Sequence, residues 1–207
     1  MASHQPFQVI HPKQVSRKLA CHAHTEEYVD KFFNGGTVLA SQLSMSRGLA
    51  TSTAGGTHHA FPDRGSGYCL INDLAVAAIH LSDTTDITRV LIGDGTAVIF
   101  KDTEHVFTFS MHCEQNFPFR KQKSDLDIGV DKGTGDEQFL RILTLLLVFL
   151  FSGLFNRDYY VMDEAIRRGI PCSVVIGGGY SQNIDVLAKR HTIMHRAATK
   201  IWSQRQL

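Results

Sequence analysis

Two adjacent histidines, His58 and His59, are the residues of this sequence whose possible chemistry is easiest to name. An imidazole near its ordinary pKa can take a proton from water, and a second imidazole beside it can hold or donate charge. Side chains of neighbouring residues point apart in regular structure, so both rings can face one cavity only where the backbone turns unusually. Gly55 and Gly56 come directly before the pair and permit such turns. Taken alone, the pair is weak evidence of a site, because surface histidines are common.

A second candidate is the run Gly177-Gly178-Gly179-Tyr180, which follows an apolar, β-branched segment. Glycines at the end of a strand let the backbone approach a ligand, and a tyrosine hydroxyl can polarise a carbonyl group. The same residues also suit an ordinary turn with a packing tyrosine. Taken alone, the run favours that simpler interpretation.

The segments around these residues predict an α/β fold. Their patterns indicate strands at 49–52, 89–92, 106–110 and 170–176, and helices at 24–33, 35–47, 72–81, 158–168 and 181–202. Strands that alternate with helices indicate a doubly wound, mostly parallel sheet with helices on both faces. In such folds the functional groups lie on loops beyond the carboxyl ends of strands, which is where both candidate runs fall.

The composition suits one globular domain over residues 1–207, with 43% hydrophobic and 20% charged residues. A formal net charge of +1 gives no global attraction to nucleic acid or anionic membranes, so we expect no direct nucleic-acid partner. The four cysteines lack C-x-x-C spacing and indicate reduced, buried thiols. Since residues 1–9 also lack a signal or transit pattern, we expect an intracellular protein of the nucleus, the cytoplasm or both.

One almost wholly apolar stretch, Ile142–Phe155, departs from this composition. It is shorter than the run of about 20 residues that spans a bilayer. A buried helix or strand is the simplest interpretation, and a membrane-inserting segment is the alternative. A third interpretation is that the stretch is foreign to the parent fold.

An ordered set of motifs joins these observations. Residues 55–73 read G-G-T-H-H-A-F-P-D-R-G-S-G-Y-C-L-I-N-D, and further along come G-D-G-T-A-V-I-F, V-F-T-F-S-M-H, F-P-F-R-K, S-D-L-D-I-G and G-T-G-D. The set resembles the histone deacetylase superfamily, and within it the bacterial and plant members usually grouped near class IV. The resemblance covers residues 35–138 and 157–198, and its long first motif is highly specific.

The resemblance implies an arginase/deacetylase-like fold and hydrolysis of acyl-lysine amides with one zinc ion. It implies that His59 is the general base and that His58 is the second, electrostatic histidine. Asp94 corresponds to the carboxylate behind His59, and Tyr180 to the hydroxyl that stabilises the tetrahedral oxyanion. The implied partners are acetylated lysines of histone tails or of other proteins.

The resemblance also implies a substrate tunnel and a second metal. Gly67 and Tyr68 match the walls of the acyl-lysine tunnel, and Phe117 matches its opposite aromatic wall. Ser110 and Met111 stand where the family binds a structural potassium ion through backbone oxygens.

The sequence departs from the family at the zinc ligands. The family takes them from a run of the form D-L-D-V-H-Q-G-D-G and from a later A-G-x-D loop. Here Ile92 is followed directly by Gly93-Asp94-Gly95, and the later loop is replaced by the apolar stretch at 141–156. A third gap falls near 33/34. The clean edges of these gaps indicate skipped exons or an altered gene model.

Other metal-like groupings do not replace the missing ligands. Asp125-Leu126-Asp127 imitates part of the lost run, but Gly129 stands where a histidine is needed, and the family has its own S-D-L-D here. Cys21, His22 and His24 do not share one helix face, and a single His112 is not a zinc site.

A catalytic zinc needs about three protein ligands and lowers the pKa of its bound water from about 15.7 to about 7. We therefore expect that this chain does not hold zinc stably and that its hydrolytic activity is impaired. The alternative is a non-catalytic regulatory or decoy isoform that binds partners or acylated lysine.

Overall fold

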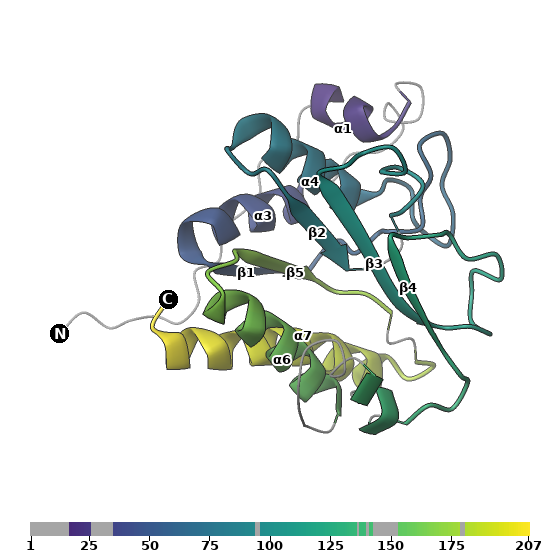
Figure 1. Cartoon of the computed structure of the whole chain (residues 1–207). Helices are drawn as coiled ribbons and strands as arrows, with labels where there is room; N and C mark the ends of the chain where they lie inside the picture. Colours follow the sequence, from purple (N-terminus) through teal and green to yellow (C-terminus); the bar gives the residue numbers. More distant parts are fainter. Residues whose placement is uncertain are drawn as a thin grey trace. The chain divides into compact units, whose positions relative to one another are not determined.

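The computed structural model describes residues 17–25, 35–93, 96–135, 137–139, 141–142, 153–178 and 181–207 (Figure 1). The helices are α1 (Arg17–Ala23), α3 (Gly36–Arg47), α4 (Asp73–Thr84), α6 (Gly153–Arg167) and α7 (Ile184–Arg205). The strands are β1 (Leu49–Ser52), β2 (Val90–Gly93), β3 (Val106–Cys113), β4 (Leu126–Val130) and β5 (Cys172–Val175). Contacts divide the chain into unit 1 (residues 1–13, 39–54 and 135–207) and unit 2 (residues 14–38 and 55–134), with the boundary inside α3.

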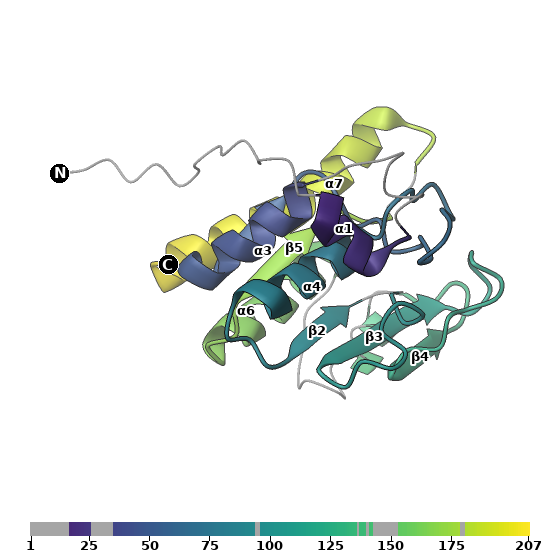
Figure 2. The ribbon, with the colours of Figure 1, turned by 90° about the horizontal axis from the view of Figure 1, so that it is seen from above.

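Unit 1 is built on the parallel pair β1–β5, in which Leu49 lies opposite Cys172 and Ser52 opposite Val175. Figures 1 and 2 show α6 and α7 on one side of this pair and α3 on the other. Met162 and Ile201 are almost fully buried between the two long helices and β1. The expected pattern of a parallel pair covered by helices on both faces is therefore confirmed here.

Unit 2 contains a three-stranded parallel sheet in the order β2-β3-β4. Helix α4 runs alongside β2 (Figure 2). Its alanines allow close packing, and Ala75 and Val76 are buried with Ile92 and Phe100 in the core of the unit. Both units thus pair parallel strands and pack helices on them, which confirms the predicted α/β class.

Most of the expected elements are present, with shifted ends. Helix α3 ends before Gly48, whose φ of +77° suits the left-handed turn that stops a helix. The expected helix at 24–33 lies mostly outside the described residues, and the short helix α1 ends just before it. Strand β4 was not expected. Of the four free cysteines, only Cys69 is fully buried, so the expectation of four buried thiols was wrong for the other three.

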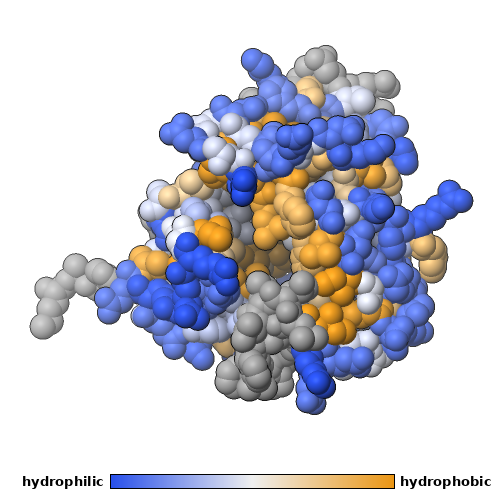
Figure 3. All heavy atoms as spheres, in the orientation of Figure 1, coloured by the Kyte–Doolittle hydropathy of each residue, from blue (hydrophilic) through white to orange (hydrophobic). Residues whose placement is uncertain are grey.

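One face of the three-stranded sheet is apolar and partly exposed to solvent. Leu91 pairs with Phe107 across β2 and β3, and paired residues of a parallel ladder point to the same side. Their side chains are 69% and 48% exposed. The same face continues through other apolar residues: Phe109, Met111, Leu126 and Ile128. Figure 3 shows hydrophobic residues gathered over this part of the molecule.

Among the described residues, no helix is long and apolar enough to cross a membrane. Most of the apolar stretch Ile142–Phe155 lies outside the described residues, at 143–152. Its last three residues, 153–155, form the start of α6.

We predict low solubility and a broad, weakly cooperative thermal transition, because an apolar sheet face and unpaired strand edges favour aggregation. Replacing Leu91 and Phe107 together by threonine should raise the soluble yield and reduce the binding of a fluorescent apolar dye. Threonine keeps the β propensity of both positions while removing apolar surface.

The matched control is Ile92→Thr with Val106→Thr, which changes two buried positions of the same strands. It should lower the melting temperature without improving solubility. A sharp two-state melt of the unaltered chain from a monodisperse sample would contradict the prediction.

Candidate functional site

The two histidines of the sequence motif lie against each other in unit 2. The ring centroids of His58 and His59 are 4.0 Å apart, with the ring planes at 57°. The His58 Nδ1–H donates a hydrogen bond to the carbonyl oxygen of Gly56 at 3.0 Å. Because a carbonyl oxygen only accepts, this bond fixes the tautomer of a neutral His58 ring with its proton on Nδ1.

Phe117 and Gly67 both lie beside His59. The rings of His59 and Phe117 meet edge to face, with centroids 5.5 Å apart. A Cβ atom on Gly67 would lie 2.8 Å from His59 Cδ2 and 2.8 Å from Phe117 Cε1. The absence of a side chain at Gly67, whose φ is +53°, therefore lets both rings approach this backbone.

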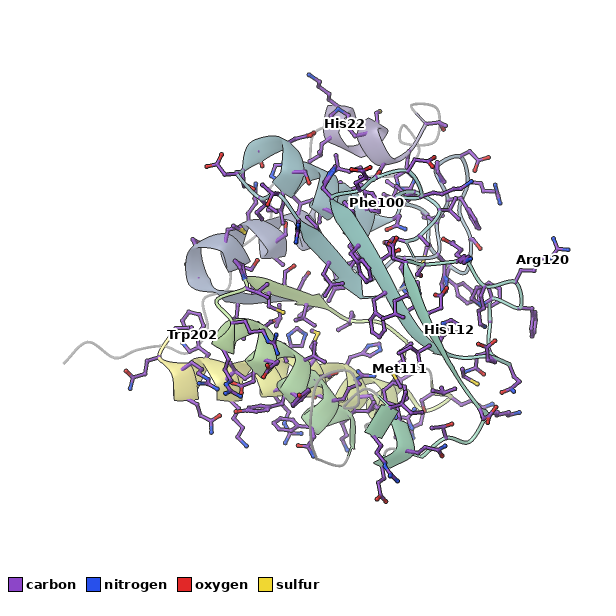
Figure 4. The ribbon with its side chains drawn as sticks, viewed as in Figure 1. His22, Phe100, Met111, His112, Arg120 and Trp202 are labelled. Atoms are coloured by element: carbon purple, nitrogen blue, oxygen red, sulfur yellow. The ribbon has the colours of Figure 1, made fainter. Side chains whose placement is uncertain are left out.

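The loop that carries Phe117 is held by Lys121. Lys121 Nζ donates to the carbonyl oxygen of Pro118 at 2.8 Å and also to that of Asn116. Arg120, labelled in Figure 4, projects away from the loop. The backbone on both sides of Phe117 is thus fixed by one lysine.

Tyr68 does not join this cluster. Its φ is +66°, and its side chain is 97% exposed. Of the residues expected to line an acyl-lysine tunnel, the structure brings Gly67 and Phe117 to His59 and leaves Tyr68 on the surface.

A buried carboxylate, that of Asp73, holds the loop before the histidines. Its Oδ2 accepts from Gly56 N at 3.0 Å and from the hydroxyl of Thr37. Its Oδ1 accepts from Thr57 N at 2.8 Å and from Thr57 Oγ1 at 2.7 Å. Sequence reasoning gave this residue no role. An acidic residue at the start of a helix that follows a glycine-rich loop was the only signal for it.

Asn72 holds the other side of the pair. Its side-chain nitrogen donates to the carbonyl oxygens of His58 at 3.1 Å and Ala60 at 3.3 Å, and its oxygen caps α4 by accepting from Ala75 N. Its backbone N–H donates to His24 Nε2 at 2.8 Å. The His24 Nδ1–H donates to the carbonyl oxygen of Phe61 at 3.1 Å.

The residues expected at the potassium site lie on β3. The buried hydroxyl of Ser110 and His112 Nδ1 are 2.8 Å apart, and His112 Nε2 is 3.7 Å from Glu114 Oε1. Met111 and His112, both labelled in Figure 4, are successive strand residues and leave β3 on opposite faces. The potassium assignment of Ser110 and Met111 stays a prediction.

Two expected catalytic residues, Asp94 and Tyr180, lie outside the described residues. Within the part of the chain that the structure describes, no group of three His, Cys, Asp or Glu side chains could hold a metal ion. The carboxylates of the S-D-L-D motif instead bond to nearby backbone. Asp125 accepts from Thr108 N at 2.7 Å, which lowers the pKa of that carboxyl, and Asp127 accepts from Ser124 N.

Residues 32–162 match the family description "Histone deacetylase domain", which is more than half of the chain. The chain belongs to the histone deacetylase family. The match includes the histidine pair, the Asn72–Asp73 helix start and the Phe117 loop.

Curated relatives agree with this assignment. An uncharacterized protein of Picosynechococcus sp. is 43% identical over 204 residues, covering 81% of this chain and 68% of the relative. Histone deacetylase 2 of Arabidopsis thaliana is 26% identical over 188 residues, covering 72% of this chain and 49% of that protein. Acetoin utilization protein AcuC of Staphylococcus aureus is 36% identical over 110 residues, 49% of this chain and 28% of that protein. The chain therefore spans half or less of the two relatives whose names state a role.

The fold agrees with a solved structure of the family. A crystal structure of an HDAC homologue complexed with SAHA matches with a TM-score of 0.62 and 18% identity, covering 92% of this chain and 72% of the other. At this level of identity the match shows the fold, and it confirms the predicted deacetylase-like architecture.

Gly67→Ala should lower the free energy of unfolding by about 1–3 kcal/mol more than Gly133→Ala does, since only at Gly67 does the new methyl overlap two rings. Gly133 is the matched control, because its φ of +88° carries a similar backbone strain while nothing lies within 4 Å of the added Cβ. Urea unfolding of both variants measures the difference. Equal losses would mean that His59 and Phe117 move aside freely.

Lowering the pH below about 6.5 should destabilise the fold through His24. Burial lowers the pKa of His24, and its bond to the Phe61 carbonyl opposes this only in part. Between the two pKa values, the unfolded chain binds a proton at His24 that the folded chain does not bind. The contribution of His24 to the free energy of unfolding is therefore constant above about pH 6.5, and stability falls as the pH drops toward the folded-state pKa. Denaturant unfolding at pH 7.5 and 5.5 should show a smaller pH dependence for His24→Gln. A pH dependence that His24→Gln leaves unchanged would contradict the prediction.

Proposed function

We propose that this chain is an acyl-lysine-recognising member of the histone deacetylase family whose capacity to hydrolyse acyl-lysine amides is impaired by missing zinc ligands. The observation that carries the proposal is the cluster of His59, Phe117 and Gly67. An imidazole there lies edge to face with an aromatic ring at 5.5 Å, beside a backbone without a side chain.

This cluster suits a long aliphatic side chain that ends in an amide. Phe117 offers apolar surface to the methylene groups of an acylated lysine, and the absence of a side chain at Gly67 lets this ring and His59 lie together. His59 lies beside the same surface and can take a proton from the water that attacks the acyl carbon.

His58 assists by holding charge next to the base. The Gly56 carbonyl accepts its Nδ1–H, at the position where the resemblance to the family implies a carboxylate from the absent D-L-D run. A neutral carbonyl stabilises a charged imidazole less than a carboxylate does. We expect His58 to be a weaker electrostatic partner here than in relatives that keep the run.

Asp94, as the carboxylate behind His59, and Tyr180, as the oxyanion donor, complete the proposal. Tyr180 would donate its hydroxyl hydrogen to the oxygen that becomes negative in the tetrahedral intermediate. Both roles come from the family motif alone, since neither residue lies among the described ones.

The described residues do not fit the zinc ion that the family implies. A catalytic zinc takes about three His, Asp, Glu or Cys ligands, and no such group occurs within the described ranges. When bound, that ion would polarise the acyl carbonyl and acidify the attacking water.

A second candidate function is binding of acylated lysine without turnover. The structure contains the cluster of His59, Phe117 and Gly67, whereas no group of metal-ligating side chains occurs among the described residues. Such a chain would act as a regulatory or decoy form that retains acylated lysines of histone tails or other proteins. We place it in the nucleus, the cytoplasm or both. Peptide binding without hydrolysis, lost in Phe117→Ala, would favour this candidate.

Two repairs should restore activity only together. Inserting V-D-L-D-V-H-Q between Ile92 and Gly93 should supply two ligands, and replacing 142–155 by a family segment with A-G-x-D should supply the third. Two ligands hold zinc weakly, whereas three fix its geometry with one position open for water. Zinc content by elemental analysis and hydrolysis of an acetyl-lysine peptide should therefore rise far more in the double repair than the two single repairs combined.

The unaltered chain should carry far less than one zinc per molecule. In the doubly repaired chain, His59→Ala should lower kcat by about 10²–10⁴-fold through loss of the base, and Tyr180→Phe should also reduce it. If the unaltered chain already hydrolyses the peptide and His59→Ala removes that activity, the account of missing ligands is wrong.

A further inference from the structure

We propose that Asn72 and Asp73, named here the Asn72–Asp73 clamp, are positioning residues that set the orientation and tautomer of the histidine pair. The catalytic meaning of that orientation rests on the function proposed above. The physical claim itself concerns the rings and does not depend on turnover.

The first step is the burial of the clamp. Asn72 is 0% and Asp73 is 2% exposed. A buried carboxylate is costly unless several donors surround it, and three of the donors around Asp73 come from Gly56 and Thr57, next to the histidines. Its favourable place in the first turn of α4 does not by itself explain why both oxygens bond to this loop.

The second step is a short chain of hydrogen bonds from Asp73 to an imidazole. Asp73 Oδ2 accepts from Gly56 N at 3.0 Å, and the carbonyl oxygen of the same Gly56 accepts from His58 Nδ1 at 3.0 Å. A change at the carboxylate that shifts Gly56 therefore moves the acceptor that fixes the His58 tautomer.

The third step is that Asn72 holds the backbone on both sides of His59. Its side-chain nitrogen donates to the carbonyl oxygens of His58 and Ala60, the residues directly before and after His59. The backbone around this ring is therefore held on both sides, which limits how far the ring can turn from Phe117.

The close fit of Gly55 agrees with this arrangement. A Cβ there would lie 2.2 Å from Thr37 Oγ1 and 2.3 Å from Asp73 Oδ2, and the φ of Gly55 is +105°. Only a residue without a side chain lets the loop come this close to the carboxylate.

A purely structural role makes a different prediction. If the clamp served only to cap α4, its loss would lower stability without changing the two rings. If it positions the pair, the ring signals of His58 and His59 must change in a chain that is still folded.

The experiment is ¹⁵N NMR of the histidine rings in the full chain, at a pH where the imidazoles are neutral. The unaltered chain should show His58 held as the Nδ1–H tautomer. The single amide oxygen of Asp73→Asn cannot accept from Gly56 N and from Thr57 N together, so one of these loop donors loses its acceptor. His58 should therefore shift toward averaged tautomers, and the His59 ring resonances should move too. Asp83→Asn removes a carboxylate from the exposed end of the same helix, where it bonds to His22, and should leave both rings unchanged.

Thr57→Val keeps Asp73 and removes one donor to it, so it serves if Asp73→Asn does not fold. It should shift the same His58 and His59 signals in the same direction by a smaller amount. Unchanged rings in a folded Asp73→Asn or Thr57→Val chain would overturn the proposal. Changed rings in a chain that does not bind an acetyl-lysine peptide would support it and leave the failure with the proposed function.

Discussion

A carboxylate can be buried only where donors replace the water it loses, and this constraint shapes the described part of the site. The donors around Asp73 come from Thr37, Gly56 and Thr57, so satisfying one charge draws the histidine loop onto the start of α4. Asn72 then ties the following backbone to the same helix end. The loop has no regular structure of its own, and its order comes from side-chain acceptors and donors at a fixed helix terminus.

In the three-stranded sheet of unit 2, only one of the two faces is buried. Parallel strands normally have both faces covered, and their sequences therefore read as apolar runs. Ile92 and Val106 are buried on the side of α4, whereas Leu91 and Phe107 on the other side remain open. The strand sequences thus retain the pattern of a sheet covered on both faces.

The predictability of the fold follows the strength of local patterns. Helix α3 is followed by Gly48, and strand β5 is a β-branched run that leads into glycines, so the sequence was enough to find them and the short strand β1 after Gly48. Helix α1 is a short R-K-L-A-C-H-A segment that packs through Leu19 and Ala23 on the core of unit 2, so tertiary contacts decide it. Strand β4, L-D-I-G-V, contains a charge and a glycine and exists through its pairing with β3. At the site, the resemblance implied that Gly67, Tyr68 and Phe117 line one tunnel, but the outward direction of Tyr68 depends on a φ of +66° that no composition rule supplies.

The hydrogen bonds that hold the histidine loop are independent of the runs in which the family resemblance implies zinc ligands. The rings of His58 and His59 are positioned by residues 55–73 with help from Thr37 and Phe117, all within unit 2. The family's zinc ligands come from two other runs, one beyond β2 and one near the apolar stretch at 142–155. The bonds that hold the histidine loop involve neither of these runs. A chain of this kind can keep the arrangement of its bases while offering no ligand group among its described residues. The histidine motif is therefore evidence for the loop geometry, which its own hydrogen bonds maintain, and does not by itself supply a set of metal ligands.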